Sequence, residues 1–146
     1  MAARSCLIAA AAVVALLLAG CGQAQKTSAG KFQGDQKAVA QTIDDLQKAG
    51  KKRDANQICE QLLAPSLVQK IEQAGNGDCS KVLDDALADA DTFDMTVEKV
   101  TVNGNRATAV VKSEAGKKDR TDSLVLEKVG SAWKIASLGA TAGGAA

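Results

Sequence analysis

The sequence contains no histidine and no tyrosine, and its 146 residues include one tryptophan, two phenylalanines and one proline. Histidine is the usual proton carrier near neutral pH and the commonest metal ligand in proteins. Its absence excludes nucleophilic catalysis by Ser-His-Asp or Cys-His groups. A zinc site would have to be built from cysteine and carboxylate alone. We therefore expect no catalytic residues, no metal and no cofactor.

The chain also lacks an excess of either charge, because 18 Lys and Arg face 17 Asp and Glu. A protein that follows a nucleic-acid backbone needs a clear cationic surplus, so we expect no nucleic-acid partner. The two most basic stretches, residues 48–53 and 117–120, are short. We interpret them as a solvated helix end and a hairpin loop; weak contact with anionic lipid headgroups is the alternative.

An apolar run of thirteen residues, 7–19, follows a single cation at Arg4. This layout is typical of a secretory signal, and the run is shorter than the roughly 20 residues that span a bilayer. The segment Leu18-Ala19-Gly20-Cys21 that ends it resembles the lipobox of bacterial lipoproteins. The resemblance implies cleavage between Gly20 and Cys21, acylation of the Cys21 thiol, and an extracytoplasmic domain anchored to the membrane of a bacterial envelope. An ordinary signal peptide with a coincidental cysteine is the alternative.

The cysteine count then leaves one pair. Under the lipoprotein interpretation, Cys6 leaves with the signal and Cys21 carries the lipid, so Cys59 and Cys79 remain in an oxidising compartment. We expect them to form a structural disulfide. The alternative, a redox-active pair, usually has only two residues between its cysteines.

The first part of the mature chain shows a helical pattern. Residues 22–30 are small and polar and are typical of a flexible tether. From about Asp35, apolar residues recur with helical spacing until Gly50. Three further helices are expected, capped by Asp54, beginning at Pro65, and capped by Asp78 or Ser80.

From Met95 the apolar residues alternate instead, which indicates strands. A change of phase predicts a β-bulge near Glu98 or Lys99. Asn103-Gly104 predicts a type I′ hairpin turn, and Gly130-Ser131 a second turn. Four strands are expected, at residues 95–102, 105–113, 120–128 and 132–138, with a longer polar loop at 114–119 and a disordered tail at 139–146.

Helices followed by strands predict an α+β domain, with N-terminal helices packed on a curved four-stranded antiparallel meander. This order resembles the NTF2-like, cystatin-related cone fold of many lipoproteins from high-GC Gram-positive bacteria. The features that resemble it are the helix at 32–46, Asp54, Cys59 and Leu62-Leu63 before Pro65, Cys79, the strands at 100–111, and the closing Gly130-Ser131-Ala132-Trp133-Lys134-Ile135. The expected organisation is a signal peptide at 1–20, a lipidated cysteine and tether at 21–31, the NTF2-like domain at 32–138, and the tail at 139–146.

The resemblance does not determine a function, because this fold hosts enzymes, adaptors and proteins without known activity. Enzymes of the family usually use His, Asp and Tyr inside the cone, and the chain has neither His nor Tyr. We therefore expect a membrane-anchored, non-catalytic module that binds a small apolar ligand or an envelope protein. A carboxylate-dependent enzyme and an accessory subunit of an envelope complex are the alternatives. The residues expected to line a cavity are Val39, Ile43, Leu124, Leu126, Trp133 and Ile135.

Overall fold

The computed structural model describes residues 27–90, 93–115 and 118–141. The expected signal peptide, its cleavage site and Cys21 lie outside the described residues. None of the helices in the described part is long and apolar enough to cross a membrane. The elements are η1 (Ala29–Lys31), α1 (Gly34–Lys52), α2 (Ala55–Gln57), η2 (Ile58–Leu62), α3 (Pro65–Gly75), α4 (Cys79–Ala88), β1 (Met95–Asn103), β2 (Arg106–Ala115), β3 (Lys118–Val129) and β4 (Ala132–Thr141).

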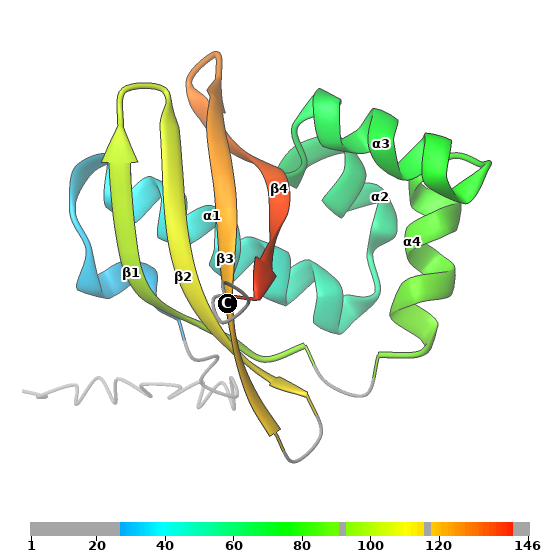
Figure 1. Cartoon of the computed structure of the whole chain (residues 1–146), viewed down its shortest axis with the longest axis horizontal. Coiled ribbons are helices and arrows are strands. Elements are labelled where there is room, and N and C mark those ends of the chain that lie inside the picture. Colours follow the sequence, from blue (N-terminus) through cyan, green and yellow to red (C-terminus); the bar gives the residue numbers. More distant parts are fainter. Residues whose placement is uncertain (1–26, 91–92, 116–117, 142–146) are drawn as a thin grey trace, which may run out of the picture.

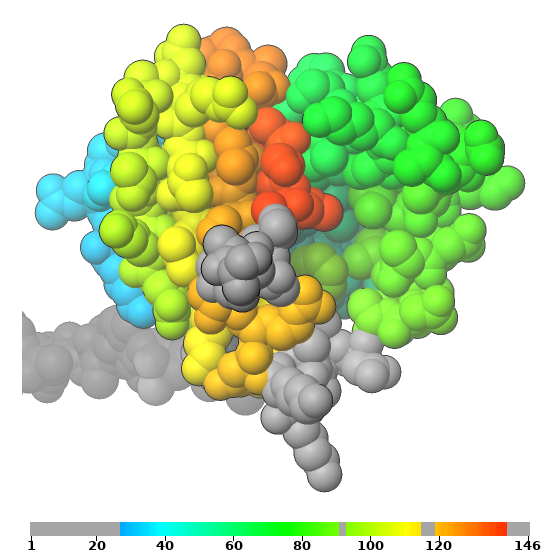
Figure 2. Space-filling view, in the orientation of Figure 1, coloured from blue at the N-terminus to red at the C-terminus, as the bar shows by residue number. Residues whose placement is uncertain are grey.

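The four strands form one antiparallel sheet in the order β1-β2-β3-β4. Helix α1 crosses behind the sheet, and the shorter helices form a second lobe beside β4 (Figure 1). The opposite face of the sheet lies at the surface of the molecule (Figure 2). This arrangement confirms the predicted α+β class and is consistent with the NTF2-like cone.

The core lies between α1 and the inner face of the sheet. Val39, Ile43 and Leu46 of α1, spaced as one helical face, are at most 6% exposed. Ala107 and Ala109 supply the opposing surface on β2 and are equally buried. Because alanine projects only a methyl group, these two positions let the helix lie close to the centre of the sheet.

The helix starts follow the sequence signals. The Asp54 carboxylate accepts a hydrogen bond from the Gln57 backbone N–H at 2.9 Å, which confirms the predicted cap of α2. Pro65 occupies the first turn of α3, as predicted. Asp78 stands at the N-cap of α4, but its side chain makes no capping bond. The π-helical turn η2, which continues α2, was not predicted.

A disulfide joins Cys59 in η2 to Cys79 at the start of α4, with a sequence separation of 20 residues. The predicted pairing is confirmed. Both cysteines are less than 10% exposed, and they belong to the same hydrophobic core as α1. The bond therefore fastens α4 to a segment that itself packs on α1 and on β4.

The β1–β2 hairpin confirms one prediction and corrects another. The register shifts between Val97 and Lys99, at the predicted bulge. The turn is one residue later than expected, because Asn103 pairs with Arg106 and leaves Gly104 and Asn105 as the central residues. Only Gly104 of this pair has a positive φ, which is the φ pattern of a type II′ turn rather than of type I′.

The polar loop expected at 114–119 is mostly strand. β2 and β3 remain paired as far as Ala115 and Lys118, so the expected loop was too long. Charges of opposite sign face each other here, because the Lys112 ammonium lies 2.7 Å from the Asp119 carboxylate. This hydrogen bond and the negative charge of Asp119 raise the pKa of Lys112 above its usual value. Such cross-strand pairs favour a strand where a run of charged residues was interpreted as a loop.

The last strand is also longer than predicted. β4 continues to Thr141, which pairs with Asp122, and so enters the expected tail at 139–146. Gly139 permits this pairing: a Cβ atom at this position would lie 1.8 Å from the Ser123 carbonyl oxygen. The small residues interpreted as disorder therefore include one that the sheet requires. Residues 142–146 lie outside the described part of the chain.

The end of the expected tether is likewise part of the domain. Ser28 and Ala29 are 2% and 5% exposed. The backbone N–H groups of Ser28 and Ala29 donate to the Asp44 carboxylate at 2.8–2.9 Å, and the Ser28 hydroxyl accepts from the Val97 N–H at 2.9 Å. We call Ser28, Ala29, Asp44 and Val97 the N-terminal clasp. It fixes the chain to α1 and β1 from Ser28 onward, three residues earlier than Lys31, the expected end of the tether.

The two outer strands also make contacts away from the sheet. The Gln36 side chain of α1 donates to the Val100 carbonyl of β1 at 3.0 Å. On the other side, Leu63 forms a single parallel bridge with Ile135 of β4, and the Ala64 N–H donates to the Ile135 carbonyl at 2.8 Å. The segment after η2 is therefore joined directly to the sheet.

Candidate ligand site

The six residues expected to line a cavity are all buried, between 0% and 6% exposed: Val39, Ile43, Leu124, Leu126, Trp133 and Ile135. All six belong to the hydrophobic core. Trp133 is held at one end of the sheet, where its ring nitrogen donates to Asp35 at 3.4 Å and the Lys128 ammonium lies 5.6 Å from the ring centre. Leu124 also lines a pocket, toward the other end.

That pocket, which we call the sheet-end pocket, has a volume of about 280 Å³ and lies between α1 and the strand ends farthest from Trp133. Its apolar side chains come from α1, from the segment before β1 and from the inner face of the sheet. Its polar side chains stand together on β2 and β3. The lining residues are Leu46, Phe93, Met95, Val111, Ser113, Arg120, Asp122, Leu124, Leu138 and Gly139.

Strand alternation brings the polar side chains to the pocket. Arg120 and Asp122 lie on the same face of β3 as the buried Leu124. Ser113 of β2 pairs with Arg120 of β3. The Arg120 guanidinium lies 3.6 Å from the Asp122 carboxylate. Because a guanidinium carries five N–H donors, one carboxylate oxygen leaves most of them available to a ligand. The pocket therefore offers donors and an acceptor along one edge.

Leu138 gives the pocket an apolar rim. Its side chain is 60% exposed, which makes it the one large hydrophobic side chain exposed among the described residues. It stands opposite Leu124 in the β3–β4 pairing. A ligand in the pocket would remove part of this apolar surface from water, which favours binding.

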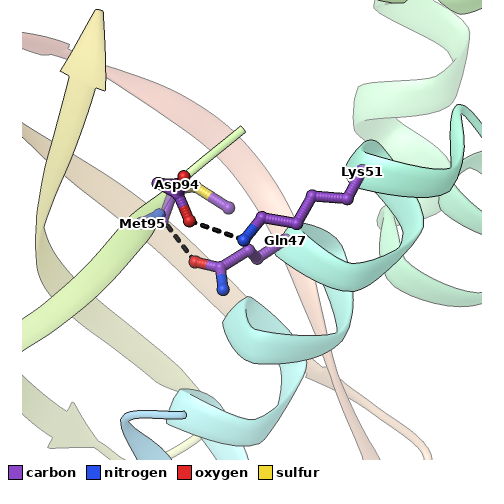
Figure 3. A network of polar contacts seen from close by, with 4 residues as sticks. All are labelled: Gln47, Lys51, Asp94 and Met95. Carbon is purple, nitrogen blue, oxygen red and sulfur yellow. Dashed lines mark hydrogen bonds and ion pairs between the residues drawn. The ribbon is translucent and has the colours of Figure 1, made fainter. Parts of the chain in front are cut away.

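Two polar contacts from α1 position the wall of the pocket (Figure 3). The Gln47 side-chain oxygen accepts a hydrogen bond from the Met95 N–H at 2.6 Å. One turn later, the Lys51 ammonium pairs with the Asp94 carboxylate at 2.5 Å. These contacts attach the start of β1 to the C-terminal part of α1, and so place Phe93 and Met95 beside the pocket.

A second hollow of about 270 Å³, the helix-end pocket, shares Phe93 with the sheet-end pocket. It is formed where α1 ends at Arg53, whose φ of 55° terminates the helix in the left-handed region. The residues that line it are Gly50, Lys51, Arg53, Leu87, Ala90, Phe93 and Asp94. Phe93 is common to both pockets.

The helical lobe contains a third hollow, the disulfide groove, of about 460 Å³. The disulfide, Leu63 and Val68 form its apolar surface. Its charged residues are three acids, Glu60, Glu72 and Asp78, together with Lys134. The Lys134 ammonium donates to the Glu60 carbonyl at 2.9 Å. Four charged side chains therefore line this groove, compared with two in the sheet-end pocket.

Within the described residues, no group of three or more Cys, Asp or Glu is placed to hold a metal ion. The arrangement of the sheet-end pocket suits non-covalent binding of a small molecule that has apolar faces and a polar edge. Sequence reasoning did not select Phe93, Ser113, Arg120 or Asp122. For the two β3 residues the signal was the strand phase, since Arg120 and Asp122 lie in the same alternation as Leu124 and Leu126 of the expected strand at 120–128.

A comparison with protein-family models matches residues 30–138 to the family described as putative lumazine-binding. Comparisons with curated proteins and with solved structures gave no significant match.

Proposed function

The chain belongs to the putative lumazine-binding family, an NTF2-like fold family, and from this premise we propose that it binds a small molecule in the sheet-end pocket. The observation that carries the proposal is the composition of that pocket. An apolar surface formed by Leu46, Met95 and Leu124 faces a hydroxyl, a guanidinium and a carboxylate that stand together on two adjacent strands. Ligand sites commonly combine an apolar lining with a few polar groups that fix orientation.

A lumazine fits this combination. Its fused ring system is flat, with apolar faces and an edge of carbonyl and N–H groups. We place the faces against Met95 and Leu124, with the ring carbonyls accepting from Arg120 and a ring N–H donating to Asp122. The pocket volume of about 280 Å³ is near the lower end of the range for ligand sites, which favours a compact ring system.

Arg120→Ala is expected to weaken the binding of a lumazine roughly tenfold, because it removes charge-assisted hydrogen bonds from the pocket edge. Isothermal titration calorimetry of the whole chain with 8-ribityllumazine measures the change. Thr121→Ala is the matched control, because Thr121 is the next residue on β3 and points to the opposite face. Absence of binding to the wild-type chain at millimolar concentrations would contradict the proposed function.

The proposed role is non-catalytic. One carboxylate, Asp122, lines the sheet-end pocket, and it is paired with Arg120 rather than with a second acid. The carboxylate-dependent alternative expects two acids that face each other in the cavity and divide the acid and base roles, and Asp122 has a cation in the place of the second acid. The pairing of Asp122 with a cation supports binding and orientation of a ligand instead.

We further propose that Cys21 is acylated and holds the domain at the extracytoplasmic face of a bacterial membrane. The N-terminal clasp supports a close approach to the bilayer. Six residues, 22–27, separate Cys21 from the clasp, and a fully extended chain of that length spans only about 20–25 Å. The ligand would therefore be collected near the membrane surface.

Cys21→Ala is expected to abolish acylation of the chain, because the proposed acylation site is lost. Metabolic labelling with radioactive palmitate followed by immunoprecipitation measures the incorporated lipid. Cys6→Ala is the control and is expected to keep the label, because Cys6 lies in the segment that cleavage is expected to remove. Label on Cys21→Ala would show that another residue is acylated.

A further inference from the structure

We propose that the sheet-end and helix-end pockets are the two halves of one site, divided by the ring of Phe93, and that the site accepts a ligand with an anionic end. The flat part of the ligand occupies the sheet-end pocket, and its anionic end lies beside Arg53 in the helix-end pocket. This inference rests on the proposed function, because it extends the same pocket.

The position of Phe93 is the first observation. Its side chain lines both hollows, and each hollow has almost the same volume, about 280 Å³ and about 270 Å³. The ring lies directly on the backbone of α1 at Gly50: a Cβ added to Gly50 would lie 2.3–2.6 Å from three atoms of the ring. The absence of a side chain at Gly50 therefore allows the ring to lie close to the helix backbone.

The two residues that follow Phe93 are held to α1 by polar contacts. On its C-terminal side, Asp94 pairs with Lys51, and the Met95 N–H donates to Gln47 (Figure 3). These contacts fix the backbone but not the ring, which is half-buried. Rotation of an aromatic side chain needs no change in either contact. In the proposed site, such a rotation joins the two hollows without disturbing the attachment of β1 to α1.

The charges of the helix-end pocket determine which end of a ligand it accepts. Lys51 and Arg53 contribute two cations and Asp94 one carboxylate. Lys51 and Asp94 neutralise each other, so the pocket keeps one net positive charge, on the Arg53 guanidinium. Arg53 has no ion-pair partner among the described residues. This charge exceeds the partial negative charge, about half a unit, at the C-terminus of α1. An anionic group on the ligand is therefore favoured, and a phosphate matches the planar guanidinium by paired hydrogen bonds.

Two compounds that differ only at one end test the charge. We expect 8-ribityllumazine 5′-phosphate to bind the whole chain roughly tenfold more tightly than 8-ribityllumazine. Arg53→Asn is expected to abolish this difference by weakening the binding of the phosphorylated compound. Asparagine is chosen because it tolerates the left-handed backbone of residue 53. Lys52→Gln, which changes an exposed cation outside both pockets, is the control and should retain the difference.

A double-mutant cycle tests the partition. Gly50→Ala displaces the Phe93 ring and is expected to weaken binding of the phosphorylated compound at least fivefold. In the Phe93→Ala background the same substitution should have no further effect, since the clashing ring is gone. Circular dichroism and thermal melting verify that each variant is folded.

The outcomes separate the two proposals. If neither compound binds, the proposed function fails. If both bind with equal affinity, or if Arg53→Asn leaves the difference intact, the proposed function stands and the anionic subsite is wrong. Additive effects of Gly50→Ala and Phe93→Ala would show that Phe93 does not divide the site.

Discussion

Asp44→Ala is expected to lower the free energy of unfolding by about 3–5 kcal/mol, the largest effect we expect from one substitution. The Asp44 carboxylate is 7% exposed and accepts three hydrogen bonds from the backbone N–H groups of Ser28 and Ala29. Truncation leaves these buried donors without an acceptor. Urea unfolding followed by circular dichroism measures the change.

Asp45→Ala is the matched control. Asp45 is the next residue on α1, and its carboxylate accepts an exposed hydrogen bond from the Gln41 side chain. We expect its removal to change stability by no more than about 0.5 kcal/mol. Equal losses for Asp44→Ala and Asp45→Ala would show that the N-terminal clasp contributes nothing specific.

The double variant Cys59→Ser, Cys79→Ser is expected to lose about 3 kcal/mol of stability, because the disulfide restricts a loop of about 20 residues in the unfolded chain. For a domain of this size, the melting temperature should fall by roughly 10–15 °C. Differential scanning calorimetry measures the shift. The lobe that contains α4 is expected to loosen first, because the bond is what fastens its start to η2.

A reducing agent provides the control for the same prediction. It should lower the melting temperature of the wild-type chain to that of the serine variant and leave the variant unchanged. Peptide mapping without reduction should recover residues 59 and 79 in one linked peptide. A wild-type chain that melts at the same temperature with and without reductant would contradict a stabilising disulfide.

The parts of the fold that could be predicted depend on neighbours in the sequence. Asp54 caps α2, Pro65 starts α3 and the phase change after Val97 gives the bulge, and each of these signals extends over only a few residues. The disulfide was predictable because the lipoprotein interpretation left two cysteines. The meander followed from three strand connections short enough to join adjacent antiparallel strands.

The errors occur where distant residues decide the structure. Ser28 and Ala29 look like tether, yet their hydrogen-bond acceptor is Asp44, fifteen or more residues away. Gly139 looks like tail, yet β3 provides its pairing partner. In both places small residues permit close backbone contact, which composition alone cannot distinguish from flexibility.

The candidate site was predicted only in outline. The six expected residues are on the inner face of the sheet and its covering helix, as their periodicity required, but five of them fill the core and line none of the sheet-end pocket, the helix-end pocket and the disulfide groove. The polar residues Ser113, Arg120 and Asp122 lie inside the expected strands 105–113 and 120–128. They line a pocket only because Leu46, Phe93 and Met95, from segments distant in the sequence, lie beside them, and a single sequence does not reveal this placement.

The contacts on the two outer strands affect how copies of this chain interact when they are close together. A free strand edge is a template for pairing with another chain, and proteins held on one membrane meet edge to edge more often than proteins in solution. Here Ser28 and Gln36 occupy backbone groups on the outer side of β1, while Leu63 and Ala64 cover the middle of β4. The segment nearest the proposed anchor therefore also protects the sheet against aggregation between neighbouring copies.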